Sequence, residues 1–141
     1  MAQKDSAFTK RLLTLVVVLG VGGFLFMMAT STMQKTVVAT EADTVYFFSI
    51  YGSAINTADI VSVEMVESIP KIGLKVNGAG LGKYKKGDYQ LDGWGTCRLY
   101  LHDNTGPYLV LTSTQRRIIL NYKDPAETEA VYLQIRDFLT M

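Results

Sequence analysis

The sequence has few of the residues that build disulfides, metal centres and catalytic dyads. Among its 141 residues there is one cysteine, Cys97, and one histidine, His102. A single cysteine cannot form an intramolecular disulfide, and one Cys with one His cannot supply the usual ligand sets of zinc. The sequence therefore predicts no disulfide framework, no metal and no cofactor, and it leaves the redox compartment open.

The net charge is also small, because 14 Lys and Arg residues are balanced by 13 Asp and Glu residues. The electrostatic field of such a chain is too weak to draw it to nucleic acid, so we expect no nucleic-acid partner. At about 100–200 residues per domain, a chain of this length has room for one folded domain and an appendage.

One long apolar run is present near the N-terminus. Residues 12–29 contain no charged residue and a single polar one, Thr14. As a helix this run spans roughly 27 Å, and with its flanks it reaches across a hydrocarbon core of about 30 Å. The sequence therefore predicts a transmembrane helix over residues 12–30, which would anchor the chain in the membrane by a single pass.

Positive charge is concentrated before this helix. Lys4, Lys10 and Arg11 precede it, whereas Lys35 is the nearest basic residue after it. The positive-inside rule then predicts a cytoplasmic N-terminal flank, residues 1–11, and a C-terminal part outside the cytoplasm. A cleaved secretory signal is the alternative, because small residues at 29–31 also follow the apolar run.

The part after the membrane segment has mainly strand character. Residues 31–43 are small and polar, and they predict a linker. Segments of β-branched, aromatic or alternating residues follow, separated by turn residues. The predicted strands cover residues 45–51, 60–69, 73–76, 83–91, 96–102, 108–114 and 117–122.

One predicted strand, residues 96–102, carries both of the scarce residues. In residues 96–102, Cys97 shares one face with Leu99 and Leu101, which predicts an inert, buried thiol. His102 falls on the other face, with Arg98 and Tyr100, and we expect it at the surface or rim. No residue stands out as a nucleophile or general base, so the sequence predicts a protein without enzymatic activity.

A helix is predicted at the C-terminus. Asp124 is a suitable N-cap, Pro125 suits the first helical position, and Glu127 could close a capping box. After this start, apolar residues recur on one face, which indicates an amphipathic helix packed on the sheet. The stripe consists of Val131, Ile135, Phe138 and Leu139, with Tyr132 beside it.

Several local features recur together in one known family. They are Tyr51-Gly52, residues 58–60, the glycines of residues 77–82, residues 87–89, the strand at 98–101, and Asn121 with Asp124-Pro125. In this order the chain resembles bacterial pleckstrin-homology-like (PH-like) domains attached to membrane segments. The resemblance implies, for residues 44–141, a mainly β fold: a bent sandwich or partly open barrel of about seven antiparallel strands, capped by the C-terminal helix. It also implies a binding module.

Two surfaces are candidates for binding. The glycines at 78, 80 and 82 precede a group of residues that could take an anionic headgroup or small molecule: Lys83, Tyr84, Lys85, Lys86 and Trp94. The alternative is that the glycines only permit a tight turn or bulge. On the predicted helix, Ala126, Ala130 and Leu133 form an apolar strip opposite the core stripe, which is a candidate interface.

The function expected from these features is that of a membrane-tethered interaction module in a bacterial envelope complex. Its partner would be a protein or peptide, or a second copy of the chain. The alternative is a ligand-binding domain that uses the glycine- and lysine-rich residues 78–86.

Overall fold

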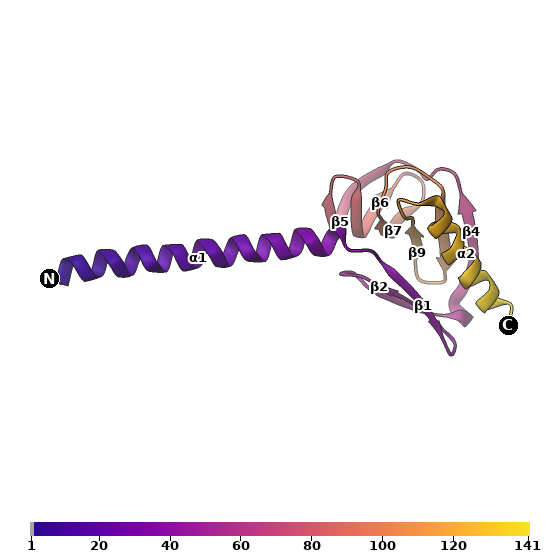
Figure 1. Ribbon diagram of the computed structural model, residues 1–141. Helices are drawn as coiled ribbons and strands as arrows, with labels where there is room; N and C mark the ends of the chain where they lie inside the picture. Colours follow the sequence, from indigo (N-terminus) through magenta and orange to yellow (C-terminus); the bar gives the residue numbers. More distant parts are fainter. Residues whose placement is uncertain (1) are drawn as a thin grey trace. The chain divides into compact units, whose positions relative to one another are not determined.

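The computed structural model describes residues 2–141, with side chains from residue 5 onward, and Figure 1 shows its elements. The chain divides into an N-terminal unit that ends at Ser31 and a C-terminal unit, Thr32–Met141. The predicted boundary near residue 44 is therefore too late, because the folded unit begins twelve positions earlier.

The N-terminal unit contains all but the last two residues of the helix α1 (Ala2–Met33). Within the described part of the chain, this is the one helix long and apolar enough to cross a membrane, over Asp5–Met33. It contains the predicted span, and its apolar side chains are exposed on every face, as suits a helix surrounded by lipid. A signal sequence would have the same properties, so the cleaved form stays an alternative.

A three-stranded antiparallel sheet begins the second unit, in the order β1 (Val37–Glu41), β2 (Thr44–Phe48) and β3 (Ser53–Asn56). β1 lies inside the predicted linker, so the linker prediction is wrong for these residues. The polar composition of residues 31–43 gave no strand signal. The structure shows that β1 pairs with β2 along its whole length and packs Val38 on the core. A short 3₁₀ helix (Thr57–Asp59) follows β3.

The second sheet has six strands in the order β4-β8-β9-β7-β6-β5. Their bounds are β4 (Ile60–Val66), β5 (Ile72–Leu81), β6 (Tyr84–Leu91), β7 (Gly95–Leu101), β8 (Tyr108–Ser113) and β9 (Arg117–Leu120). The pair β7–β9 is parallel and the other neighbours are antiparallel. The β8–β9 hairpin causes this arrangement, because it turns back and places β9 rather than β8 beside β7.

The mainly β prediction with a C-terminal helix is confirmed, and two details of it change. Residues 2–141 contain nine strands rather than about seven, and one pair is parallel where all were expected to be antiparallel. The two sheets do not close into a barrel.

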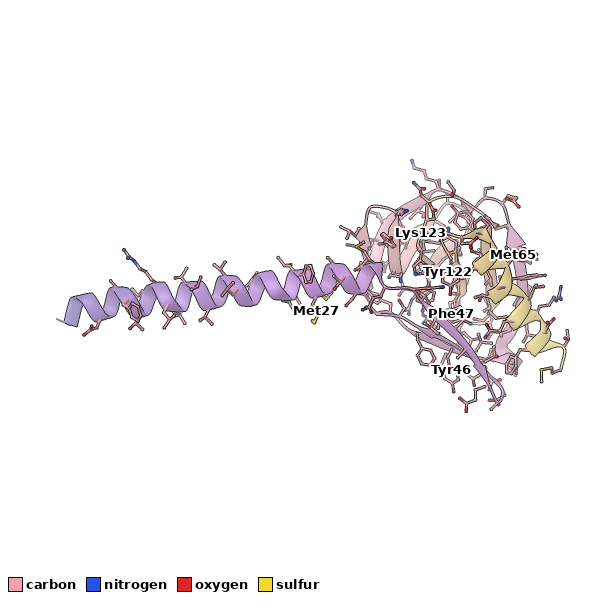
Figure 2. All side chains as sticks on the ribbon, viewed as in Figure 1. Met27, Tyr46, Phe47, Met65, Tyr122 and Lys123 are labelled. Carbon is pink, nitrogen blue, oxygen red and sulfur yellow. The ribbon has the colours of Figure 1, made fainter. Side chains whose placement is uncertain are left out.

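Hydrophobic side chains fill both faces of the central strands. One cluster lies between the two sheets and the C-terminal helix and includes Phe47, Tyr100 and Tyr122; Figure 2 labels Phe47 and Tyr122. The other includes Cys97 and Leu99, so the inward position predicted for this cysteine is confirmed. Because both faces of β7 are covered, Tyr100 is fully buried as well, and the polar face expected for it is a second core face.

The helix α2 (Pro125–Leu139) closes the first cluster. Asp124 caps it, with its side chain accepting a 2.9 Å hydrogen bond from the N–H of Ala126. Ile135 is fully buried, and the rest of the predicted stripe is half-buried against the core, which confirms the inward face. Glu127 pairs with Lys35, whereas the sequence predicted a capping-box role.

The glycine-rich segment is a strand rather than a loop. β5 continues through it to Leu81 and pairs with β6 across two irregularities in register. A Cβ on Gly78 would lie 2.5 Å from the carbonyl oxygen of Lys86, and Gly87 has a φ of +110°. These two glycines are therefore required for the close approach of β5 and β6.

Candidate functional site

Thr36 lies in a cradle of three side chains and is 1% exposed. Its N–H donates to His102 Nε2 at 3.0 Å, its hydroxyl oxygen accepts from Lys86 Nζ at 3.0 Å, and its carbonyl oxygen accepts from the Tyr122 hydroxyl at 2.6 Å. Lys86 belongs to β6, while His102 and Tyr122 follow the ends of β7 and β9. The segment before β1 is thus fixed to the six-stranded sheet by every polar group of one residue.

Lys86 is a fully buried lysine surrounded by oxygen atoms. Besides Thr36, its ammonium donates to the carbonyl oxygen of Gln34 at 2.7 Å and to Ser49 Oγ at 3.5 Å. Burial lowers its pKa from 10.5 to about 8. The group therefore stays mainly charged at neutral pH, where its hydrogen bonds offset part of the cost of burial.

His102 is 4% exposed, so the expectation of a surface histidine is wrong. Its Nε2 accepts the Thr36 N–H, which leaves the proton on Nδ1 to be donated to the carbonyl oxygen of Asn121 at 2.7 Å. Burial, and secondarily the charge of Lys86, lower the pKa of the imidazole, which favours this neutral form. With both ring nitrogens engaged, His102 contributes a ring surface and neither a general base nor a metal ligand.

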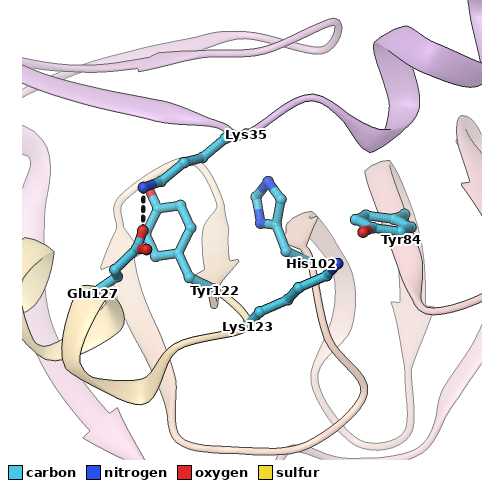
Figure 3. Close-up of a pocket in the computed structure, with 6 residues that line it drawn as sticks. All are labelled: Lys35, Tyr84, His102, Tyr122, Lys123 and Glu127. Carbon is cyan, nitrogen blue, oxygen red and sulfur yellow. Dashed lines mark ion pairs between the residues drawn. The ribbon is translucent and has the colours of Figure 1, made fainter.

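A pocket of about 150 Å³ lies beside this cradle (Figure 3). The ring of His102 stacks on Tyr122 with centroids 5.1 Å apart, and Tyr84 meets His102 edge-on at 6.4 Å. The walls are therefore largely aromatic. The lining residues are Lys35, Tyr84, His102, Tyr122, Lys123 and Glu127.

Charged groups surround the aromatic walls. Lys35 forms an ion pair with Glu127, drawn as a dashed line in Figure 3, and its Nζ also lies 5.1 Å from the centroid of the Tyr122 ring. Lys123 Nζ lies 5.5 Å from the centroid of Tyr84. The Tyr84 hydroxyl holds the pKa of Lys123 above its ordinary value, so this lysine is charged at neutral pH. In the part of the chain that the structure describes, Lys123 forms no ion pair.

The residues predicted to bind an anion do not form one site. Tyr84 lines the pocket, and Lys83 Nζ lies 5.9 Å from the centroid of its ring. Lys86 is buried against Thr36. Lys85, which precedes it in β6, donates to the carbonyl oxygen of Gly82 at 3.2 Å and lines a different cavity together with Lys83. This separation follows from the alternation of side chains along a strand.

Trp94 lies beyond the opposite end of β6 from Tyr84, in the turn before β7. The guanidinium carbon of Arg117 is 4.2 Å from the centroid of its ring, and the ring packs on the second core cluster. Trp94 therefore belongs to the structural edge of the core rather than to the pocket.

The residues of the predicted helix interface differ in exposure. Ala126 and Ala130 are exposed and Leu133 is half-buried. Ala130 also lines a cavity of about 380 Å³ with Val37 and Val38, between α2 and β1. The role of this strip stays a prediction.

Four residues of the cradle and pocket were missed in the sequence: Lys35, Thr36, Tyr122 and Lys123. The first two lie in the predicted linker, and the last two directly precede the N-cap of α2. Their only local signal in the sequence is this position at the boundaries of elements. The contacts that bring them together are long-range: Thr36 bonds to His102, 66 positions away, and to Tyr122, 86 positions away.

Among the described residues, no three His, Cys, Asp or Glu side chains are grouped so that they could hold a metal ion. Comparison with protein-family models, with curated proteins and with solved structures gives no match. The resemblance to PH-like domains therefore stays a prediction from local sequence features.

Proposed function

We propose that the chain is a membrane-anchored, non-enzymatic interaction domain that pairs an extended segment of a protein partner with the strand β5. The basic flank would keep the N-terminus of α1 in the cytoplasm and place Thr32–Met141 on the outer side of a bacterial membrane. The first strand of the domain begins four positions after α1 ends at Met33. A bound partner would thus be kept close to the membrane.

The observation that supports this proposal is the open edge of β5. This strand has ten residues, contains no proline, and among the described strands has a neighbour only in β6. Leu74 is 73% exposed and Val76 is 56% exposed. Proteins usually shield such an edge, so a long one with exposed apolar side chains favours the addition of a partner strand.

The pairing of β5 with β6 is regular along only part of the strand. The register of β5 against β6 shifts between Ile72 and Asn77, and it is regular from there to Leu81. Regular backbone spacing is needed for a ladder of hydrogen bonds, so the partner strand would pair with residues 77–81. The part of the partner that extends beyond residue 77 would then lie beside Leu74 and Val76.

Site-specific photocrosslinking in the full-length chain tests this proposal. A benzophenone amino acid at Leu74, in the native membrane, should yield one discrete adduct after irradiation. The same probe at Val61 is the matched control, because Val61 is 68% exposed on β4, the strand at the other end of the sheet. An adduct of twice the chain mass would identify a second copy as the partner.

A second experiment distinguishes specific pairing of the partner with β5 from random collision with the probe. With the probe moved to Val76, Leu74→Asp should abolish the adduct, whereas Val61→Asp should leave it. Equal adducts from positions 61 and 74, or an adduct at 76 that survives Leu74→Asp, would contradict the proposal.

The alternative function, ligand binding by the glycine- and lysine-rich segment, has less support. It needs Lys83, Lys85 and Lys86 on one surface, and Lys86 is committed to Thr36. Any small-ligand site on this domain is better placed in the aromatic pocket.

A further inference from the structure

We infer that the pocket between Tyr84, His102 and Tyr122 binds a ring-sized apolar group that carries a carboxylate. This site includes no residue of the β5 edge, so it stands independently of the proposed function. Free aromatic acids and the C-terminal residue of a peptide share this chemistry.

The size of the pocket limits the ligand to about one ring. Its volume is about 150 Å³, and an apolar cavity of about this volume accepts one benzene molecule. The walls are the rings of His102 and Tyr122, stacked at 5.1 Å, and the ring of Tyr84, edge-on to His102. Flat aromatic walls favour a flat or compact apolar group.

The histidine offers no strong polar contact to the ligand. Nε2 is occupied by the Thr36 N–H and Nδ1 donates to the carbonyl oxygen of Asn121. The hydroxyl of Tyr122 is likewise engaged with the carbonyl oxygen of Thr36. The inner walls are therefore apolar, and selectivity for charge has to come from the rim, which we define as the charged lining residues Lys35, Lys123 and Glu127.

The rim favours an anion over a cation. Aromatic pockets often take cations on their ring faces, but here those faces already attract the protein's own lysines, Lys35 on Tyr122 and Lys123 on Tyr84. Glu127 is neutralised by Lys35. Among the lysines that line the pocket, Lys123 is the one without an ion pair in the described part of the chain, although the charge of Asp103 also acts on it. It would attract a carboxylate.

The full-length chain in detergent micelles provides a single-residue readout. His102 is the only histidine in the chain, so histidine labelled with ¹³C and ¹⁵N reports on this pocket alone. N-acetylphenylalanine, which represents a C-terminal residue, and phenylacetate, a free acid, are the two probes. At low salt at least one should shift the ring signals of His102 in a saturable way, and the tighter of the two identifies the source of the ligand.

N-acetylphenylalanine amide is the control for the carboxylate, and choline is the control for a cation. The amide has no charge and partitions into micelles at least as well as the acid, so a shift caused by the detergent would appear with both. We expect saturation with the acid, a markedly weaker response to the amide and none to choline.

Lys123→Gln tests the rim and Lys85→Gln is its matched control, since each removes one lysine charge and Lys85, which is half-buried, lines a different cavity. Lys123→Gln should raise the dissociation constant of the acid by about three- to fivefold, as for an ion pair near the surface. The His102 spectrum without probe should show a folded pocket in both variants, and Lys85→Gln should leave the dissociation constant unchanged. Saturable binding of choline, equal binding of acid and amide, no saturable shift with either acid, or equal effects of the two variants would overturn the inference.

Discussion

The ammonium group of Lys86 lies 3.0 Å from the hydroxyl oxygen of Thr36, a residue 50 positions earlier in the chain. Both residues are buried. A buried charge is stable only while its hydrogen-bond acceptors remain in place. The segment before β1 is therefore a structural part of the domain, and the first prediction concerns where that domain begins.

Residues 32–141, expressed alone, should fold into a soluble domain with a β-dominated circular dichroism spectrum and a cooperative denaturant transition. A fragment of residues 45–141 should not, because it lacks β1, Gln34 and Thr36, and so removes two acceptors of the Lys86 ammonium and the N–H that donates to His102 Nε2. Such losses each cost about 1–3 kcal/mol, against a total stability of roughly 5–15 kcal/mol. Equal stability of the two fragments would show that the cradle contributes little.

Thr36→Val should lower the free energy of unfolding of residues 32–141 by about 1–3 kcal/mol. The change keeps the side-chain shape but removes an acceptor from a buried ammonium. The measurement is a urea titration followed by circular dichroism.

Thr96→Val is the matched control, because Thr96 is an exposed residue of β7. We expect it to change stability by no more than about 0.5 kcal/mol. If the two substitutions had the same effect, the hydrogen bond to Lys86 would not be a source of stability.

Local patterns were sufficient to predict α2 and most strands. Asp124 and Pro125 define the start of the helix by chemistry within one turn, and Ile135 is placed by a period of 3.6 residues. These signals depend on neighbours in sequence, and the folded environment agrees with them.

The pocket and β1 could not be predicted in the same way. Thr36 is a short polar residue in a polar segment, and its burial depends on His102 and Tyr122, more than 60 positions away. The position of His102 was misread because period-2 alternation was taken to mean one buried face. β7 is covered on both faces, so its second set of side chains is buried too.

The helix α2 should depend most on Ile135. Ile135→Ala should cost about 2–5 kcal/mol, because this side chain is fully buried. Phe138→Ala should lower the free energy of unfolding by less than truncation of a fully buried phenylalanine would, because Phe138 is half-buried against the same core. Leu133→Ala should lower it the least. Urea titrations of the three variants test this order. If Leu133→Ala were the most harmful of them, the helix would pack with a different face.

The orientation of the chain can be tested with fusions after Met141. Because the basic residues precede the apolar helix, alkaline phosphatase, which folds only outside the cytoplasm, should be active in such a fusion. Replacing Lys4, Lys10 and Arg11 by Gln should reduce that activity. A green fluorescent protein that is fluorescent only in the cytoplasm is the complementary reporter, and bright fluorescence with the native flank would reverse the assignment.

Lys86 should make the stability of the domain rise between about pH 8 and pH 10. Its pKa is lowered by burial from 10.5 to about 8. In this interval the unfolded chain therefore holds a proton at residue 86 that the folded chain has released, and stability increases with pH, by on the order of 3 kcal/mol at most. Urea titrations of residues 32–141 at about pH 7, 8, 9 and 10 measure the change.

The buried tyrosines set the upper limit of this interval and have the opposite effect. Burial raises the pKa of Tyr100 and Tyr122 above the ordinary value of 10, so above that pH the unfolded chain loses protons that the folded chain keeps, and stability falls. Lys86→Met should remove the rise between pH 8 and pH 10, while the neighbouring Lys85→Met, which replaces a half-buried lysine, should retain it. A rise that persisted in Lys86→Met would assign the effect to another group. Burial also raises the pKa of Cys97 from 9.0, which lowers stability in the same interval. A fall in the native domain that Lys86→Met abolished would therefore mean that the Lys86 ammonium is stabilised by its acceptors beyond the cost of its burial.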